Sequence, residues 1–125
     1  MGRVFVIKAF GRWAKGQDID DTQLLKAILD AEIGLIAADL GDGLVKLRLA
    51  RPGHGKSGGF RTIVAFKKGT RAIYLEGWGK NEFENINEPY LRQLKKLANI
   101  YFHLDEASLQ AAIDGRAIRE ITEVM

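Results

Sequence analysis

Residues 44–49 read LVKLRL, and residues 60–78 read FRTIVAFKKGTRAIYLEGW. In the first stretch apolar residues alternate with Lys46 and Arg48, which is the period of a half-buried strand whose two cations lie together on one face. The second stretch holds two runs of β-branched and aromatic residues around Lys68-Gly69-Thr70, a hairpin turn signal, so its two strands are expected to be antiparallel neighbours. These residues predict a three-stranded antiparallel meander.

Helical patterns precede and follow this meander. Asp20 is a suitable N-cap, Gln23 stands where a capping box requires it, and Gly34 is a suitable stop. Asn87 and Pro89 form a second helix start. The other expected elements are a strand at Val4–Ile7, a polar connection at Gly11–Gln17 and an amphipathic helical segment at Asp105–Ile113 closed by Gly115. We therefore predict an α+β fold for a single domain spanning residues 1–125, with a small, mainly antiparallel sheet packed against helices on one side.

The composition excludes several classes of protein. The chain has no cysteine, so it forms neither disulfides nor thiolate metal sites, which fits a reducing cytoplasm. Its two histidines, His54 and His103, have no carboxylates at ligand spacing, and we expect no metal ion and no cofactor. The sequence contains no run of 18 apolar residues and no signal-peptide pattern, so we expect a cytoplasmic protein that does not enter a membrane.

The charge is distributed unevenly along the chain. The net charge of +3 combines a segment at residues 44–80, with nine Lys or Arg against one Glu, and a remainder with ten bases against fifteen acids. The segment therefore carries +8 and the remainder −5. A contiguous basic segment on an acidic body is typical of a protein that binds a phosphate backbone, although a solvated basic face without a ligand is the alternative.

Residues 50–57, ARPGHGKS, match a relaxed form of the phosphate-binding loop. The strict form begins with glycine, whereas this stretch begins with Ala50. The loop of nucleotide hydrolases also opens into a helix whose amides face the phosphates, whereas here two glycines and the strand-like run at 60–66 follow. We therefore expect no nucleotide hydrolysis, and Lys56 is better suited to a phosphate of a polynucleotide.

Four segments together resemble a HigB-like branch of the RelE toxin superfamily: KLRLAR at 46–51, GKSGG at 55–59, FRTI at 60–63 and WGKNE at 78–82. Their order and spacing match over about residues 35–97. The resemblance implies a RelE-like fold and a toxin of a two-component toxin–antitoxin module. It further implies cleavage of messenger RNA on the ribosome, with inhibition of translation, and neutralisation by a cognate antitoxin.

Metal-free RNA cleavage requires that the 2′-oxygen loses a proton, that the 5′-oxygen gains one, and that added charge on the phosphate is stabilised. Arg61 suits the last role because its planar fork can hold two phosphate oxygens and is always charged. Its structural alternative is an ion pair with Glu76. A lysine packed among other cations is more easily neutral, so Lys46, Lys56 and Lys80 are candidates for the proton transfers.

The remaining candidates are expected to contact RNA. His54 has a suitable side chain for proton transfer, but it lies in a glycine-rich loop. Trp78 can stack on a base or belong to the core, and alternation places it on the same sheet face as Tyr74. The RNA-binding set predicted from the sequence is Arg48, Arg51, His54, Lys67 and Trp78.

The region that follows residues 79–82 departs from the family pattern. Several relatives carry a tyrosine or histidine near the end of their chain as a proton-transfer group, whereas this region of the present sequence holds Phe83 and Asn87. Tyr90 and Tyr101 are the available replacements. The alternative function is therefore a non-catalytic protein of the same fold that binds RNA or the ribosome, or whose basic face binds an acidic protein partner.

Overall fold

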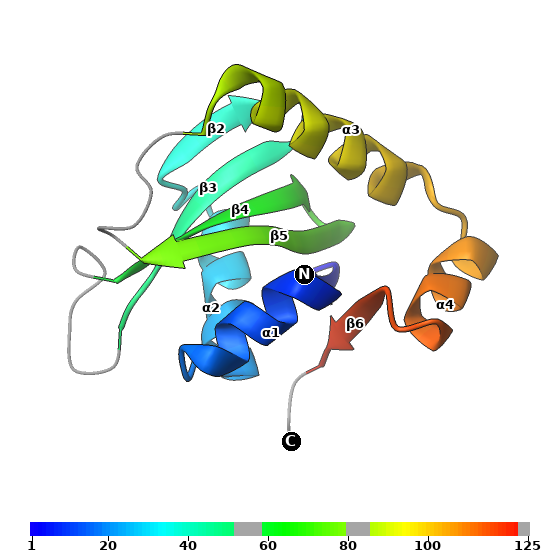
Figure 1. The fold of residues 1–125 in the computed structure, drawn as a ribbon, viewed down its shortest axis with the longest axis horizontal. Coiled ribbons are helices and arrows are strands. Elements are labelled where there is room, and N and C mark those ends of the chain that lie inside the picture. Colours follow the sequence, from blue (N-terminus) through cyan, green and yellow to red (C-terminus); the bar gives the residue numbers. More distant parts are fainter. Residues whose placement is uncertain (52–58, 80–85, 123–125) are drawn as a thin grey trace.

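The computed structural model describes residues 1–51, 59–79 and 86–122. In this part of the chain a six-stranded sheet of order β2-β3-β4-β5-β1-β6 carries four helices (Figure 1). The strands are β1 (Arg3–Ile7), β2 (Ala38–Gly41), β3 (Leu44–Leu49), β4 (Phe60–Lys67), β5 (Arg71–Gly79) and β6 (Ile118–Ile121). The helices are α1 (Lys8–Gly16), α2 (Asp21–Glu32), α3 (Glu88–His103) and α4 (Glu106–Asp114).

The predicted meander is confirmed. β3 pairs antiparallel with β4, and β4 pairs antiparallel with β5 around a turn in which Gly69 has a φ of +72°. Gly59 stands where β4 begins, and a Cβ added to it would lie 1.9 Å from the carbonyl oxygen of Leu49. Only glycine therefore allows the chain to return this close to β3.

The rest of the sheet combines segments that are far apart in the sequence. β1, confirmed as a strand, lies between β5, to which it is parallel, and β6, to which it is antiparallel. The two edge strands, β2 and β6, were not predicted, because each has only four residues and a weak alternation of apolar and polar side chains. The α+β class and the mainly antiparallel sheet are confirmed.

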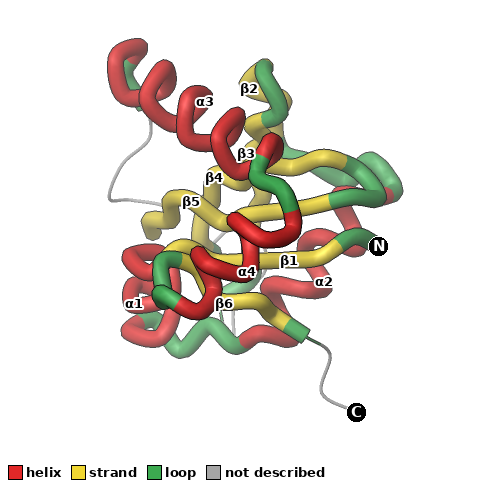
Figure 2. Tube along the Cα trace, turned by 90° about the vertical axis from the view of Figure 1, so that its right-hand side faces the viewer, coloured by secondary structure: helices red, strands yellow, loops and turns green. Residues whose placement is uncertain are grey.

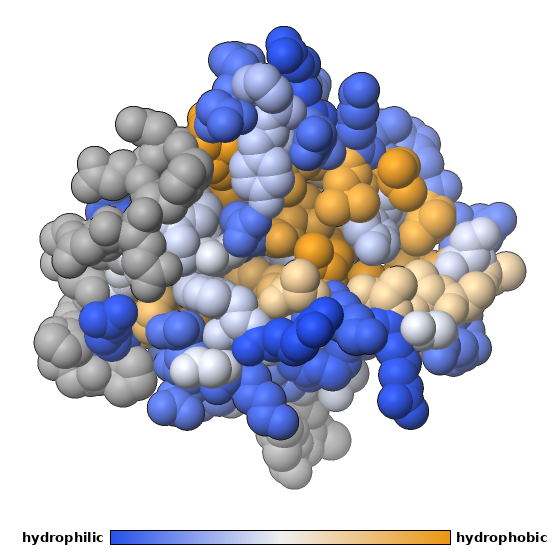
Figure 3. Space-filling model, viewed as in Figure 1, coloured by the Kyte–Doolittle hydropathy of each residue, from blue (hydrophilic) through white to orange (hydrophobic). Residues whose placement is uncertain are grey.

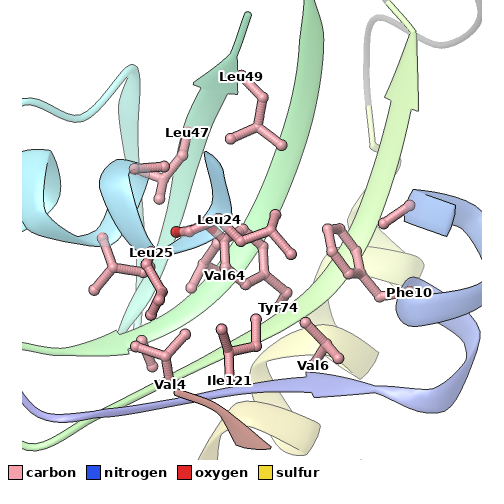
Figure 4. Close-up of a cluster of buried hydrophobic side chains, with 14 of the residues drawn as sticks. Val4, Val6, Phe10, Leu24, Leu25, Leu47, Leu49, Val64, Tyr74 and Ile121 are labelled. Carbon is pink, nitrogen blue, oxygen red and sulfur yellow. The ribbon is translucent and has the colours of Figure 1, made fainter. Parts of the chain in front are cut away.

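The helices, however, cover both faces of the sheet, so the prediction of helices on one side is wrong. One buried cluster joins α1 and α2 to the sheet through residues such as Phe10, Leu24 and Val64 (Figure 4). A second cluster joins α3 and α4 to the other face through residues such as Leu94 and Leu109. In Figure 2 α3 lies above β4 and β5, and α1 and α2 lie mostly below them. Both faces are buried because β4 and β5 carry apolar side chains on each of their two faces.

Helix α1 replaces the polar connection that the sequence predicted at Gly11–Gln17. It buries Phe10 and Ala14, and the ring of Phe10 stacks on Tyr74 with centroids 4.9 Å apart. Two glycines and three cations in nine residues hide the helical pattern in the sequence. Packing against the sheet therefore overrides a poor local propensity.

The other helices begin as predicted. Asp20 and Gln23 form the reciprocal capping box of α2, and Gly34, with a φ of +90°, follows its end. Asn87 accepts a hydrogen bond from the Tyr90 amide at the start of α3, and Asp105 caps α4 in the same way. No helix in the described ranges is both long and apolar enough to cross a membrane.

A β-bulge in β5 overturns the predicted position of Trp78. Ile63 pairs with Glu76 but Val64 pairs with Tyr74, so Leu75 is an extra residue in β5. The bulge shifts the alternation by one residue. Trp78 consequently lies with the α3 cluster, whereas Tyr74 lies with the α1–α2 cluster on the opposite face.

Candidate nucleic-acid interface

Two arginines face each other at one corner of the sheet, where β3 ends and β4 begins. Arg48 and Arg61 are direct partners in the antiparallel ladder. Directly opposite residues project to the same face, which here is the face of Ile63 and Ala65 and thus the one that α3 covers in part. Lys46 is on this face too, two residues before Arg48. Arg48 is exposed, and the other two are half-buried.

The ion pair considered for Arg61 is not formed. The Arg61 guanidinium donates a long hydrogen bond, 3.4 Å, to the carbonyl oxygen of Gly59, and it makes no salt bridge with Glu76. The Glu76 carboxylate instead accepts two hydrogen bonds. One comes from the backbone N–H of Gly77 at 3.1 Å, and the other comes from the hydroxyl of Tyr90 on α3. The carboxylate nearest in the ladder is therefore held by the helix and not by the arginine pair.

Tyr90 is placed by the direction of α3, which runs back along β5. Near the start of the helix Tyr90 bonds Glu76, and near its end the carbonyl oxygen of Tyr101 accepts a hydrogen bond of 2.6 Å from Arg71. Burial, followed by the hydrogen bond and negative charge of Glu76, raises the pKa of Tyr90 to about 12. The phenol is therefore protonated at neutral pH and can act as a proton donor. Tyr101 is at the other end of β5, away from the arginine pair.

The remaining described candidates are not all brought to this corner. Arg51 is exposed beside it, with its guanidinium carbon 4.9 Å from the centre of the Phe60 ring. Trp78 pairs with Arg61 across the ladder but is only 5% exposed, so its ring supports the site from the core. Lys67 is exposed at the far end of β4, six residues or about 20 Å of strand from Arg61.

Three candidates, Lys56, Lys80 and His54, lie outside the described residues. The ranges 52–58 and 80–85 that contain them connect β3 to β4 and β5 to α3. Both connections therefore begin or end at the corner that carries Arg48 and Arg61. Within the described residues no cluster of three or more His, Asp or Glu side chains is placed to hold a metal ion.

Sequence reasoning missed the pairing of Glu76 with Tyr90. One signal was available, the short stretch of sequence between the end of β5 and the start of α3. If α3 is to cover the sheet, it must run back over β5, and its first turn then lies near the end of that strand. The bulge that turns Glu76 toward α3 leaves no mark in the sequence pattern.

Comparison with known proteins assigns the family. The model of the family described as the RelE toxin of the RelE/RelB toxin–antitoxin system matches residues 2–121, which is nearly the whole chain. No curated protein matches the sequence at a significant level. The family match includes every strand and helix of the fold and the corner that carries Arg48 and Arg61. The chain therefore belongs to the RelE toxin family of toxin–antitoxin systems.

Proposed function

We propose that this toxin is a metal-independent endoribonuclease that cuts messenger RNA and so inhibits translation. The observation that carries the proposal is the direct pairing of Arg48 with Arg61 on one face of the sheet. Like charges directly opposite each other destabilise a sheet. An RNA phosphate held between the two guanidinium groups would convert this repulsion into two charge-assisted interactions.

The face around the pair supports RNA binding over a generic basic surface. Lys46 extends the cationic row along β3. Arg51 follows the end of the strand, but its guanidinium lies over the Phe60 ring, which packs in the α1–α2 cluster on the other face. The only carboxylate that the ladder brings near Arg61 among the described residues, Glu76, is bonded to Tyr90. The two connections at 52–58 and 80–85 add Lys56, His54 and Lys80 to the sequence that flanks this corner, and all three remain candidates for RNA contact or proton transfer.

The proposed reaction is attack of the 2′-oxygen on the adjacent phosphorus. The 2′-hydroxyl loses its proton, a bond forms from the 2′-oxygen to phosphorus, and the bond from phosphorus to the 5′-oxygen breaks. The products are a 2′,3′-cyclic phosphate and a 5′-hydroxyl. Arg61 stabilises the added charge on the phosphate, and Arg48 fixes its position. Lys46 is the described candidate for removing the 2′ proton.

Tyr90 is the proposed donor to the leaving 5′-oxygen. Its raised pKa keeps the proton on the phenol until a strongly basic alkoxide develops. Glu76 orients the hydroxyl and can receive or return its proton. Tyr90 thus takes the place of the tyrosine or histidine that relatives carry nearer the end of the chain.

The finer assignments of the proposal rest on the resemblance to the family. The segments FRTI at 60–63 and WGKNE at 78–82 favour the HigB-like branch. Membership of a toxin–antitoxin family implies a cognate antitoxin. Cleavage on the ribosome and a cytoplasmic location complete the proposal and rest on the same resemblance.

The decisive experiment is inducible expression of the wild type, Arg61→Ala and Lys96→Ala in a bacterium, with growth recorded and transcript ends mapped. Lys96 is an exposed lysine on α3 and serves as the control for loss of one charge. We expect growth arrest and new intragenic ends with the wild type and the control, and neither with Arg61→Ala. Arrest without new ends would replace the nuclease by a non-catalytic block of translation. No effect from a folded wild-type protein would favour the protein-binding alternative.

A further inference from the structure

A small cavity lies beside the last part of β5, on the edge of that strand that faces away from β4. β1 pairs with this edge only as far as Tyr74, because the chain turns into α1 after Ile7. In the described ranges no strand follows the edge from Leu75 onward. α1 and α3 pass on either side of it and leave a cavity of about 280 Å³ between them. Figure 3 shows apolar side chains between α3 at the top and α1 below it, where β5 lies in Figure 1.

The walls of the cavity are apolar, and one of them is an aromatic ring in a fixed position. Leucine and isoleucine side chains from β5, α3 and the end of β1 form much of the lining: Ile7, Leu75, Leu94 and Leu97. The half-buried ring of Trp13 also lines the cavity. It lies against Gly77, where an added Cβ would stand 2.3 Å from a ring carbon, and it packs edge-on against Phe60. The ring is therefore in place before a ligand arrives.

Three polar side chains line the same cavity, namely Glu76, Tyr90 and Gln93. The Glu76 carboxylate accepts one hydrogen bond at each oxygen, from the Gly77 N–H at Oε1 and from the Tyr90 hydroxyl at Oε2. Each oxygen keeps a second lone pair that a ligand donor can use. Gln93 is exposed one turn after Tyr90 on α3, and its amide supplies both a donor and an acceptor.

The cavity adjoins the corner that carries the arginine pair. Tyr90 belongs to both, because it lines the cavity and is the proposed proton donor of the cleavage reaction. Ile63, the ladder partner of Glu76, is two residues from Arg61 along β4. Standard strand spacings then put the Cα atoms of Glu76 and Arg61 about 8 Å apart. One nucleotide spans this distance, so a phosphate at the arginine pair can have its neighbouring base in the cavity.

We propose that the cavity binds the base of the nucleotide on the 3′ side of the cut and selects a base that carries an amino group. The inference rests on the proposed RNA cleavage. The nucleotide on that side supplies the leaving 5′-oxygen to which Tyr90 donates, so its base is the one next to Tyr90. Proteins recognise an unstacked base by an aromatic ring beside it and hydrogen bonds to its edge. Trp13, Glu76 and Gln93 provide both.

The size of the cavity favours a single base over a protein segment. A volume of about 280 Å³ is just below the range of pockets that hold drug-sized molecules, so it suits one small ring system. An extended peptide would need a longer groove.

The Glu76 carboxylate determines the expected preference, because it only accepts hydrogen bonds. Guanine presents two adjacent donors to it, the ring N–H and the amino group, and adenine and cytosine present one amino group each. Uracil flanks its single N–H with two carbonyl oxygens, which the carboxylate repels. We therefore expect guanine to bind best and uracil worst.

The test uses RNAs that differ only in the base on the 3′ side of the cut, on ribosome-bound messenger if free RNA is not cleaved. Ala9→Phe fills the mouth of the cavity from an exposed position in the first turn of α1. Ala107→Phe is the matched control, since Ala107 is exposed at the same position of the first turn of α4. We expect the wild type and the control to cleave before guanine about tenfold faster than before uracil, and Ala9→Phe to lose this preference. A wild type without the preference, or an Ala9→Phe variant that keeps it, would overturn the proposal.

A binding measurement separates failure of this inference from failure of the nuclease proposal. Guanosine 5′-monophosphate and uridine 5′-monophosphate are titrated into the protein while the indole N–H signal of Trp13 is followed by NMR, with Trp13→Phe identifying the signal. The guanosine nucleotide should shift it and bind about tenfold more tightly than the uridine nucleotide, and Ala9→Phe should show no shift. If the wild type cuts no RNA, this shift alone decides, and its absence overturns the base-binding cavity.

A second pair of variants keeps the test valid if Ala9→Phe does not fold. Gln93→Ala removes an exposed amide of the cavity, and Gln110→Ala removes an exposed amide of α4 as its control. Gln93→Ala should reduce the preference for guanine severalfold, whereas Gln110→Ala should leave it unchanged. Equal preferences in these two variants would overturn the proposal.

Discussion

The hydroxyl of Tyr90 donates a hydrogen bond to the carboxylate of Glu76, and this bond joins the first turn of α3 to the bulged end of β5. It has two consequences for the corner of the sheet beside it. It fixes a phenolic proton on the face that carries Arg48 and Arg61. It also engages the carboxylate that would otherwise be the natural partner of Arg61. The two arginines therefore remain available to bind an anionic ligand.

Tyr90→Phe should reduce RNA cleavage by about 100-fold, the low end of what one positioned proton-transfer group contributes. The hydrogen bond to Glu76 is lost, but the ring and its packing remain. The measurement is the single-turnover rate of cleavage by purified toxin, on ribosome-bound messenger if free RNA is not cut. Tyr101→Phe is the matched control, because it removes the hydroxyl of another half-buried tyrosine of α3 near the opposite end of β5. Equal rates for Tyr90→Phe and the wild type would remove Tyr90 from the mechanism.

Arg48→Ala should weaken RNA binding without destabilising the fold. Removing one member of a like-charged pair relieves repulsion of about 0.2–1 kcal/mol, so the melting temperature should stay constant or rise slightly. The affinity for RNA should fall, and the slope of log affinity against log salt should decrease by about one. Lys67→Ala at the far end of β4 is the control and should change the slope less. A clear drop in melting temperature for Arg48→Ala would instead mean that Arg48 stabilises the folded sheet.

The sequence was sufficient for those elements whose signals are local. The alternation along β3, the turn at Gly69 and the caps at Asp20 and Asn87 each depend on neighbouring residues only, and each is found where expected. α1 was missed because its stability depends on packing of Phe10 against Tyr74 on a distant strand. β6 was missed because four residues become a strand only through pairing with β1, more than 100 positions earlier.

The same division applies to the candidate site. The common face of Lys46 and Arg48 follows from alternation within one strand, whereas the position of Arg61 opposite Arg48 depends on the register between two strands and on the close approach at Gly59. The pairing of Glu76 with Tyr90 depends on a bulge, and a shift of one residue in β5 reversed the predicted face of Trp78. Register and bulges arise from contacts between segments, which a single sequence does not display.

Gly77→Ala should destabilise the protein by about 1–3 kcal/mol, the usual cost of overpacking. A Cβ at position 77 would lie 2.3–2.7 Å from three atoms of the Trp13 ring, which is itself packed edge-on against Phe60 with centroids 5.5 Å apart. Gly16→Ala is the control, since a Cβ there has no atom within 4 Å and should be neutral or slightly stabilising. Chemical denaturation of the two variants provides the comparison. Equal stability would show that α1 can move away from β5 at little cost.

The pairing of Glu120 with Arg3 should make part of the stability dependent on pH. The hydrogen bond from Arg3, supported by its charge, lowers the pKa of Glu120 below its ordinary value, against a smaller opposing effect of burial. A carboxylate with a lowered pKa in the folded state contributes stability above its unfolded pKa, about 4.3, and loses it as the pH falls through the folded value. Glu120→Gln should therefore be less stable than the wild type by up to about 1 kcal/mol at pH 7, and the difference should shrink toward pH 3. Thermal melts between pH 3 and pH 7 measure this, and in an Arg3→Gln background the same substitution should have little effect at any pH. A difference that is independent of pH in both backgrounds would mean that the glutamate acts through packing and not through its charge.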